Sequence, residues 1–140
     1  MNFRRLGFFA AILTTVFVGF SLLAQGQGGP RLYDPSMEST LQGSVTAVNT
    51  VTGRHGWNGI HFTLQSSGQS YDVHVGPSAY LERHGFVFAE GDQVEVVGSK
   101  VDMSGTATLI AREIKKDGKI LTLRDRQGIP LWSGGPRTAQ

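Results

Sequence analysis

The 140-residue sequence contains no cysteine, which excludes a disulfide framework, a thiolate metal site and a cysteine nucleophile. It also lacks a GxSxG elbow and an HExxH helix. The glycine-rich residues 53–59 are not followed by the lysine and helix of a phosphate-binding loop. The carboxylates are scattered among turns and strand ends, so no glycosidase pair can be assigned. We therefore expect a binding protein and not an enzyme.

The sequence has no large excess of basic charge either. The formal net charge is +2, from 13 basic and 11 acidic residues. Two of the basic residues are Arg4 and Arg5, so the chain beyond them is neutral. Proteins that bind nucleic acid through its phosphates usually carry a basic excess. The charge distribution therefore disfavours nucleic acid as the partner.

The N-terminus has the pattern of a secretory signal peptide. Arg4 and Arg5 precede an apolar segment over residues 6–23, and small residues at positions 24 and 26 suit a cleavage site. An uncleaved anchor is the alternative, because the apolar run is near the ~18 residues of a membrane span. We expect cleavage, which predicts a periplasmic or secreted protein with no membrane span after removal of the signal peptide.

Composition divides the chain into four parts. Residues 27–39 contain Pro30 and Pro35 without hydrophobic periodicity, which indicates a linker. The predicted organisation is a signal peptide over 1–26, the linker over 27–39, a folded domain over 40–127 and a C-terminal tail over 128–140, whose end we expect to be disordered.

Residues 60–75 are predicted to form a β-hairpin around which the domain is organised. Apolar and polar residues alternate on both sides of Ser67 and Gly68, which suit a two-residue turn. This turn places Phe62 opposite Val73 on the apolar face. It also places His61 opposite His74 on the polar face.

The remaining patterns predict an all-β fold. Alternation and turn signals indicate a strand over 41–48 with a bulge or bend at Gly43, a loop over 49–59, a helix over 76–85, strands over 93–99 and 108–114, and a return strand over 119–123. Three strands, a short helix and two more strands are the order of an OB-fold. We therefore predict a five-stranded OB-fold-like barrel with one short helix between strands 3 and 4, preceded by a signal peptide. A small β-sandwich and an SH3-like barrel are the alternatives. The predicted core residues are Phe62, Leu64, Val73, Val94 and Val96.

Five segments carry a resemblance to known proteins: IHFTL, YDVHVGPSAYL, GDQVEVVGSKV, LIAREI and LTLRDRQGIPLWSG. Together, over about residues 41–134, they resemble a set of small exported bacterial proteins of largely uncharacterised role. More distantly, the layout is similar to the periplasmic bacterial OB-fold family, which includes stress-tolerance proteins. The resemblance implies a periplasmic binding role and transfers no site residue.

The paired histidines are the main candidate for a site. Imidazole is a common ligand of zinc, copper and nickel, and opposed strand residues have Cβ atoms about 4.5–5.5 Å apart. We therefore predict that His61 and His74 hold a divalent transition-metal ion, with His55 or Asp72 as a third ligand. A polar, pH-responsive surface is the alternative.

Two loop residues are candidates for ligand binding together with the histidines. An exposed Trp57 could stack on a base or a sugar ring. A second interpretation is that Trp57 folds over the barrel mouth as a lid. Arg54 could support an anionic ligand, although loop arginines are usually only solvated. The sequence places Trp132 over the apolar end of the barrel.

Two functions are consistent with these patterns. The first is a non-catalytic periplasmic OB-fold module that binds a small ligand, a metal ion or an envelope protein partner through the face around the hairpin. The alternative is a binder of nucleic acid or an anionic polymer that uses Trp57 and the basic segment over residues 115–126. Neutral charge and predicted export favour the first.

Overall fold

Six strands make up most of residues 32–133, which are the residues that the computed structural model describes. The predicted signal peptide (1–26) and the predicted disordered end of the tail (134–140) lie outside them. In chain order the elements are η1 (Pro35–Met37), β1 (Glu38–Thr52), η2 (Arg54–Gly56), β2 (Asn58–Ser66), β3 (Gln69–Pro77), α1 (Ser78–Arg83), β4 (Gln93–Met103), β5 (Thr106–Lys116) and β6 (Lys119–Thr122).

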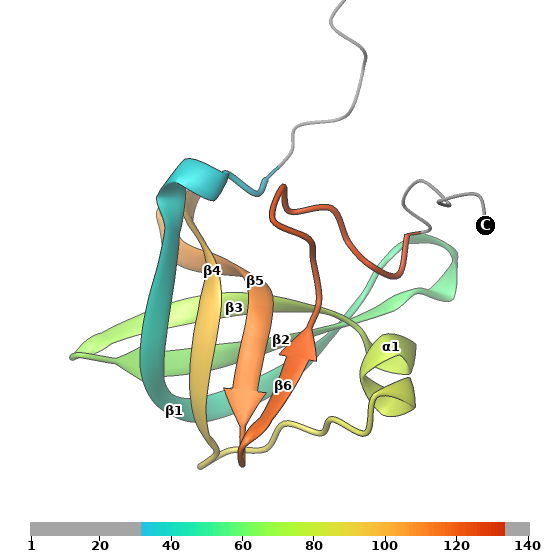
Figure 1. Cartoon of the computed structure of the whole chain (residues 1–140), viewed down its shortest axis with the longest axis horizontal. Coiled ribbons are helices and arrows are strands. Elements are labelled where there is room, and N and C mark those ends of the chain that lie inside the picture. Colours follow the sequence, from blue (N-terminus) through green and yellow to red (C-terminus); the bar gives the residue numbers. More distant parts are fainter. Residues whose placement is uncertain (1–31, 134–140) are drawn as a thin grey trace, which may run out of the picture.

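Five of these strands close into a barrel (Figure 1). Antiparallel pairing joins β1 to β2 and β4, β2 to β3, and β4 to β5. A short parallel ladder between β3 and β5 then closes the ring in the order β1-β2-β3-β5-β4. With α1 between β3 and β4, this is the arrangement of an OB-fold. The predicted five-stranded barrel with one short helix is confirmed.

The β2–β3 hairpin has the predicted register. His61 lies opposite His74, Phe62 opposite Val73, and Leu64 opposite Tyr71. The turn residues Ser67 and Gly68 both have positive φ angles, 49° and 78°. This backbone matches the twist of the flanking strands, which explains why two residues suffice for the connection.

The core fills the barrel with the predicted residues. Phe62, Leu64, Val73 and Val96 are fully buried, and Val94 is nearly so. Tyr80 and Leu81 of α1 cover one end, and the Tyr80 hydroxyl donates to the carbonyl of Thr122 at 2.8 Å. Trp132 packs against the same core cluster, as predicted. A Cβ atom on Gly76 would lie 2.9 Å from its ring, so glycine is needed there for this close contact.

The first strand and the following loop differ from the prediction. β1 runs from Glu38 to Thr52 instead of over 41–48, and residues 49–52 pair with residues 58–61. The predicted loop over 49–59 is therefore mostly a ladder. The run VNTVT is rich in β-branched residues, which favour a strand even where the strand extends beyond the barrel.

The bulge or bend that was predicted at Gly43 lies slightly further along β1 in the structure. The register of β1 against β2 shifts between Val45 and Ala47, so the bulge follows Gly43 by a few residues. At Gly43 itself the backbone of β2 comes so close that a Cβ atom would lie 2.1 Å from the carbonyl oxygen of Gln65. Gly43 therefore permits close strand contact where β1 passes from β4 to β2.

The helix is shorter than the predicted range of 76–85. Pro77 is the last residue of β3 and the N-cap of α1, not its first helical residue. His84 is the C-cap, and Gly85 follows with φ +68°, the left-handed conformation that commonly ends a helix.

Truncation of the central core side chain tests this packing. We expect Phe62→Ala to lower the free energy of unfolding by about 3–5 kcal/mol, because it removes a fully buried ring and leaves a cavity. Urea unfolding followed by circular dichroism measures the change. Val87→Ala is the control, since Val87 is 73% exposed and its loss should change stability by about 0.5 kcal/mol or less. A loss below about 1 kcal/mol at Phe62 would contradict the observed strand phase.

Candidate metal centre

Three side chains on the outer face of the hairpin form a compact cluster. His61 comes from β2, and Asp72 and His74 come from β3. Asp72 Oδ2 lies 3.0 Å from His74 Nε2 and 3.6 Å from His61 Nδ1. The two imidazole rings are 3.9 Å apart between centroids, with their planes tilted by 32°. The cluster therefore offers one oxygen and two nitrogen atoms within 4.8 Å of one another.

Strand pairing alone brings these residues together. His61 and His74 are direct cross-strand partners, so their side chains share a face. Asp72 precedes His74 by two residues and therefore projects from the same side of β3. The parallel ladder places Thr108 and Ile110 of β5 beside Asp72 and His74, and both of these neighbours are buried. The cluster thus lies where three paired strands run side by side, on rigid backbone.

The protonation state of His61 suits a ligand. Burial lowers the pKa of His61 below its usual 6.5, and the nearby His74 lowers it further, while Asp72 opposes the shift. His61 is therefore neutral at neutral pH. A neutral imidazole keeps a lone pair that a metal ion can accept.

The spacing of the ligand atoms fits a transition-metal ion. Bonds of about 2.0–2.2 Å place adjacent ligand atoms about 2.8–3.6 Å apart in octahedral or tetrahedral geometry. The two distances from Asp72 Oδ2, 3.0 and 3.6 Å, match such edges. Two imidazoles and one carboxylate suit zinc, copper, nickel or ferrous iron. Three protein ligands on one side would leave other coordination positions open to water or to a further ligand.

His55 and Arg54 lie in the loop of the β1–β2 hairpin. His55 has a φ of 61° within η2, is exposed, and is not a member of the cluster. Of the two third ligands that the sequence allowed, the structure therefore brings Asp72 and not His55 to the paired histidines. Arg54 belongs to η2, and its side chain lies outside the described part of the structure.

Trp57 is half-exposed and packs on the hairpin itself. Cβ atoms built on Gly53 and Gly59 would lie 2.8 and 2.7 Å from its ring, so the indole lies flat over both glycines. Trp57 is not among the residues of the core cluster or those packed against it, so the contacts that the structure gives its ring are with the hairpin glycines. Gly59 and His61 are two residues apart on β2 and share a face. Trp57 therefore lies on the same side of the sheet as the cluster.

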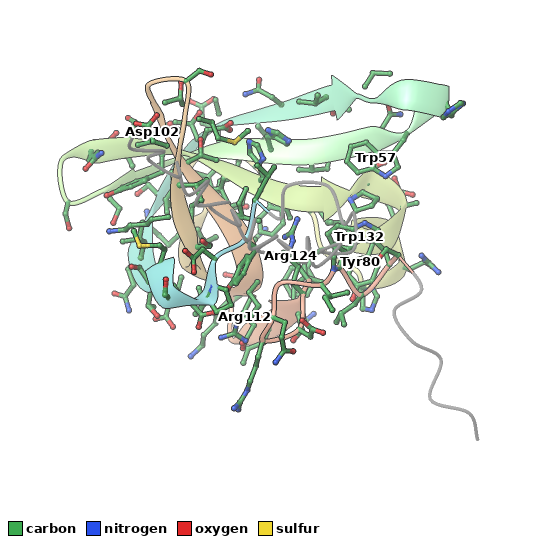
Figure 2. The ribbon with its side chains drawn as sticks, turned by 90° about the horizontal axis from the view of Figure 1, so that it is seen from above. Trp57, Tyr80, Asp102, Arg112, Arg124 and Trp132 are labelled. Carbon is green, nitrogen blue, oxygen red and sulfur yellow. The ribbon has the colours of Figure 1, made fainter. Side chains whose placement is uncertain are left out.

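The basic segment over residues 115–126 contributes less free charge than its sequence suggests. Lys116 pairs with Asp92 at 2.8 Å. Arg124 is buried, and its guanidinium donates to the carbonyls of Val75 and Ala111 and lies 4.9 Å from the ring of Trp132. Figure 2 shows Arg124 beside Trp132 and Tyr80. Burial lowers the pKa of Arg124 to about 10, so it remains charged at neutral pH.

Charge is distributed unequally between the described residues and the ends of the chain. All 11 acidic residues fall within residues 32–133. Four of the 13 basic residues, Arg4, Arg5, Arg31 and Arg137, fall outside that range. The folded part therefore carries more negative than positive charge, which further disfavours binding to a polyanion.

Between residues 32 and 133, no helix has the length and apolar character required to cross a membrane.

Fold and site together define a class: a small OB-fold-like barrel with a candidate His–Asp–His metal centre on its outer face. Residues 37–121 match the MamS/MamX magnetosome protein family, and the chain belongs to this family. The predicted resemblance to OB-fold-like proteins is thus confirmed for the fold, while the motifs in the sequence did not indicate this family.

Two curated relatives are magnetosome proteins MamS. The protein from Paramagnetospirillum magneticum AMB-1 is 29% identical over 102 residues, which cover 71% of this chain and 57% of the relative. The protein from Magnetospirillum gryphiswaldense MSR-1 is 26% identical over 102 residues, with the same coverage. The chain therefore spans a little more than half of the length of these relatives.

Solved structures that are similar include the mitochondrial single-stranded DNA binding protein Rim1 of S. cerevisiae. One crystal structure of Rim1 has 12% identity and a TM-score of 0.45, covering 64% of this chain and 96% of Rim1. A second has 17% identity and a TM-score of 0.44, covering 59% and 96%. The assignment of the fold here follows from the strand pairing of the chain itself.

The stability of the barrel should not depend on the cluster. We expect His61→Ala and His74→Ala each to change the free energy of unfolding by about 1 kcal/mol or less without added metal, because both side chains lie outside the core. Urea unfolding in the presence of a chelator measures this, with Phe62→Ala as the destabilised reference. A loss above about 2 kcal/mol would show that the imidazole pair is a structural element of the barrel.

Proposed function

We propose that this protein is a non-catalytic binding module that holds a divalent transition-metal ion through His61, Asp72 and His74. The observation that carries the proposal is the convergence of three ligand atoms within 4.8 Å on paired strands. The strands fix the Cα positions before any ion arrives, so binding requires little ordering of the backbone. Only rotations of the side chains are needed to bring the two imidazoles and the carboxylate onto one ion.

The place of action is part of the proposal. The N-terminal sequence favours export, which would expose the site to the periplasm or to the cell exterior. The curated relatives are named magnetosome proteins, and we extend an association with the magnetosome to this chain. In this setting the open coordination positions would accept water, a small ligand or a side chain of an envelope protein partner.

The immediate surroundings of the ion would favour binding over catalysis. The cluster lies on the outer face of a sheet, and its side chains are between 20% and 35% exposed. Catalytic metal sites gain much of their effect from a dry, shaped cavity around the open position. A partly exposed site on a strand surface instead suits capture, storage or presentation of an ion.

Isothermal titration calorimetry with zinc, copper and nickel tests the proposal. The protein, purified in the form that cells accumulate, should bind one ion per chain. His61→Ala, His74→Ala and Asp72→Asn should each weaken binding at least about tenfold, because each removes one of three ligands. His55→Ala is the matched control: it removes an exposed imidazole outside the cluster and should leave the affinity unchanged.

Two results would refute the metal site. One is the absence of binding to all three metals. The other is binding that survives the three cluster substitutions undiminished, which would place the ion elsewhere on the chain. Dependence on His55 together with the cluster would instead enlarge the ligand set that the structure shows.

A further inference from the structure

The β1–β2 hairpin projects beyond the barrel as an arm with one unpaired strand edge (Figure 1). β1 pairs with β4 only over residues 38–44 and with β2 over residues 44–52. Past Val45, whose backbone bonds to Gly91 and Asp92, no other described strand pairs with the outer edge of β1. Residues 47–52 therefore present an open edge. From this edge we infer that the protein forms a symmetric dimer through antiparallel pairing of β1 with β1 of a second copy.

Hydrogen bonding defines which backbone groups are available on this edge. The N–H of Gly53 donates to the carbonyl of Trp57 across the hairpin at 2.6 Å. Alternate residues of a strand direct their N–H and C=O groups to the same side, so Asn49 and Val51 also face β2. Val48, Thr50 and Thr52 face the opposite side. Their backbone groups are the ones that a second strand would bond.

The side chains of the edge permit pairing with a copy of itself. Residues 47–52, with the sequence AVNTVT, contain no charge, no proline and no glycine. A two-fold axis places the same short segment opposite itself, so any charge would meet a like charge. The absence of charge in this segment removes that repulsion, and its β-branched residues favour an extended strand.

The outer edge of β6, which is also free, shows the usual protection against pairing. β6 has only four residues, Lys119–Thr122, and begins with a lysine. Short length and lysine are two of the means by which edge strands avoid association. The open edge of β1 over residues 47–52 is longer than β6 and contains no lysine. The β1 edge is therefore open to a partner strand, whereas the β6 edge is protected.

Apolar residues next to the edge would add buried area to the pairing. Val48 and Val51 are 37% and 43% exposed, and a groove of about 150 Å³ runs beside Val48. Ile60, Phe86 and Val87 also line this groove. In the antiparallel arrangement the tip of each arm lies beside Val48 and the groove of the other copy. Strand pairing alone buries less than a stable dimer needs, so these contacts supply the apolar part of the interface.

Analytical ultracentrifugation of the protein as cells accumulate it, from about 1 to 200 µM, tests the dimer. The wild-type chain should sediment as a dimer at the upper end. Thr50→Pro removes an outward N–H, and Thr50→Lys places two ammonium groups near the axis. Each should raise the dissociation constant at least about 100-fold, because symmetry repeats the change in the interface. Ile120→Lys, on the exposed face of β6, is the matched control and should leave the dimer intact.

Cross-linking supplies a measurement that does not depend on the proline variant folding. The chain has no cysteine, so Thr50→Cys introduces a single thiol. A short bis-maleimide should join two Thr50→Cys chains and leave Ile120→Cys chains monomeric. A wild-type monomer at every concentration, or a dimer that persists in Thr50→Lys without cross-linking at residue 50, would overturn the inference. Neither result bears on metal binding, which is tested separately.

Discussion

The parallel ladder between β3 and β5 is the contact on which the rest of the structure depends. Only three residue pairs form it, joining residues 72–74 to residues 108–110. Without it the remaining strands would form an open, curved sheet in which Phe62, Leu64 and Val73 would lose one wall of the core. The ladder also holds two residues of the candidate metal centre in position, because Asp72 and His74 are two of the three β3 residues that form it.

Arg124 completes the closure where the ladder ends. Beyond His74 and Ile110 the two strands diverge, and the guanidinium of Arg124 donates to the carbonyls of Val75 and Ala111 on either side of the gap. Trp132 covers its outer side at 4.9 Å. Among the described residues no carboxylate lies within ion-pair distance of Arg124. Its charge is thus stabilised by two carbonyl oxygens and an aromatic ring. Because the guanidinium has several N–H donors, it can bond to one carbonyl on each strand at the same time.

Strand β5 belongs both to the barrel and to the part of the sheet that β6 adds outside the barrel. One edge of β5 pairs with β4 over most of its length. The other edge pairs first with β3, over residues 108–110, and then with β6, over residues 113–116. β6 therefore continues the sheet from the point at which β3 leaves it. This division explains why β6 adds a sixth strand to the sheet without entering the barrel.

Local patterns in the sequence were sufficient to predict the order of the elements, the register of the β2–β3 hairpin and which strand residues face the core. Alternation of period two assigned Phe62, Leu64 and Val73 to the interior, and the Ser67–Gly68 turn fixed His61 opposite His74. The same local signals failed at the ends of strands. Strand β1 continues to Thr52 because its ladder with β2 extends past the barrel, beyond Val48, where the alternation that predicted the strand ends.

Contacts between distant segments were beyond the reach of local patterns. The ladder that flanks the site joins residues 72–74 to residues 108–110, and no short-range signal announces a parallel partner. Arg124 resembles its neighbours Lys119 and Arg126 in sequence, yet it alone of these three is buried, because the barrel leaves two carbonyls facing it. The choice between His55 and Asp72 as third ligand likewise depended on the path of the β1–β2 loop.

The position of Arg124 has a consequence for the order in which the chain folds. Synthesis delivers the chain from its N-terminus, so β1 to β5 are complete before residue 124 is added. Until Arg124 is in place, the carbonyls of Val75 and Ala111 lack the guanidinium that bonds to them in the folded chain. Trp132 lies over this guanidinium, 4.9 Å from ring centroid to Arg124 Cζ. The bridge across the gap between β3 and β5 therefore requires the C-terminal segment, although that segment supplies no strand to the ring.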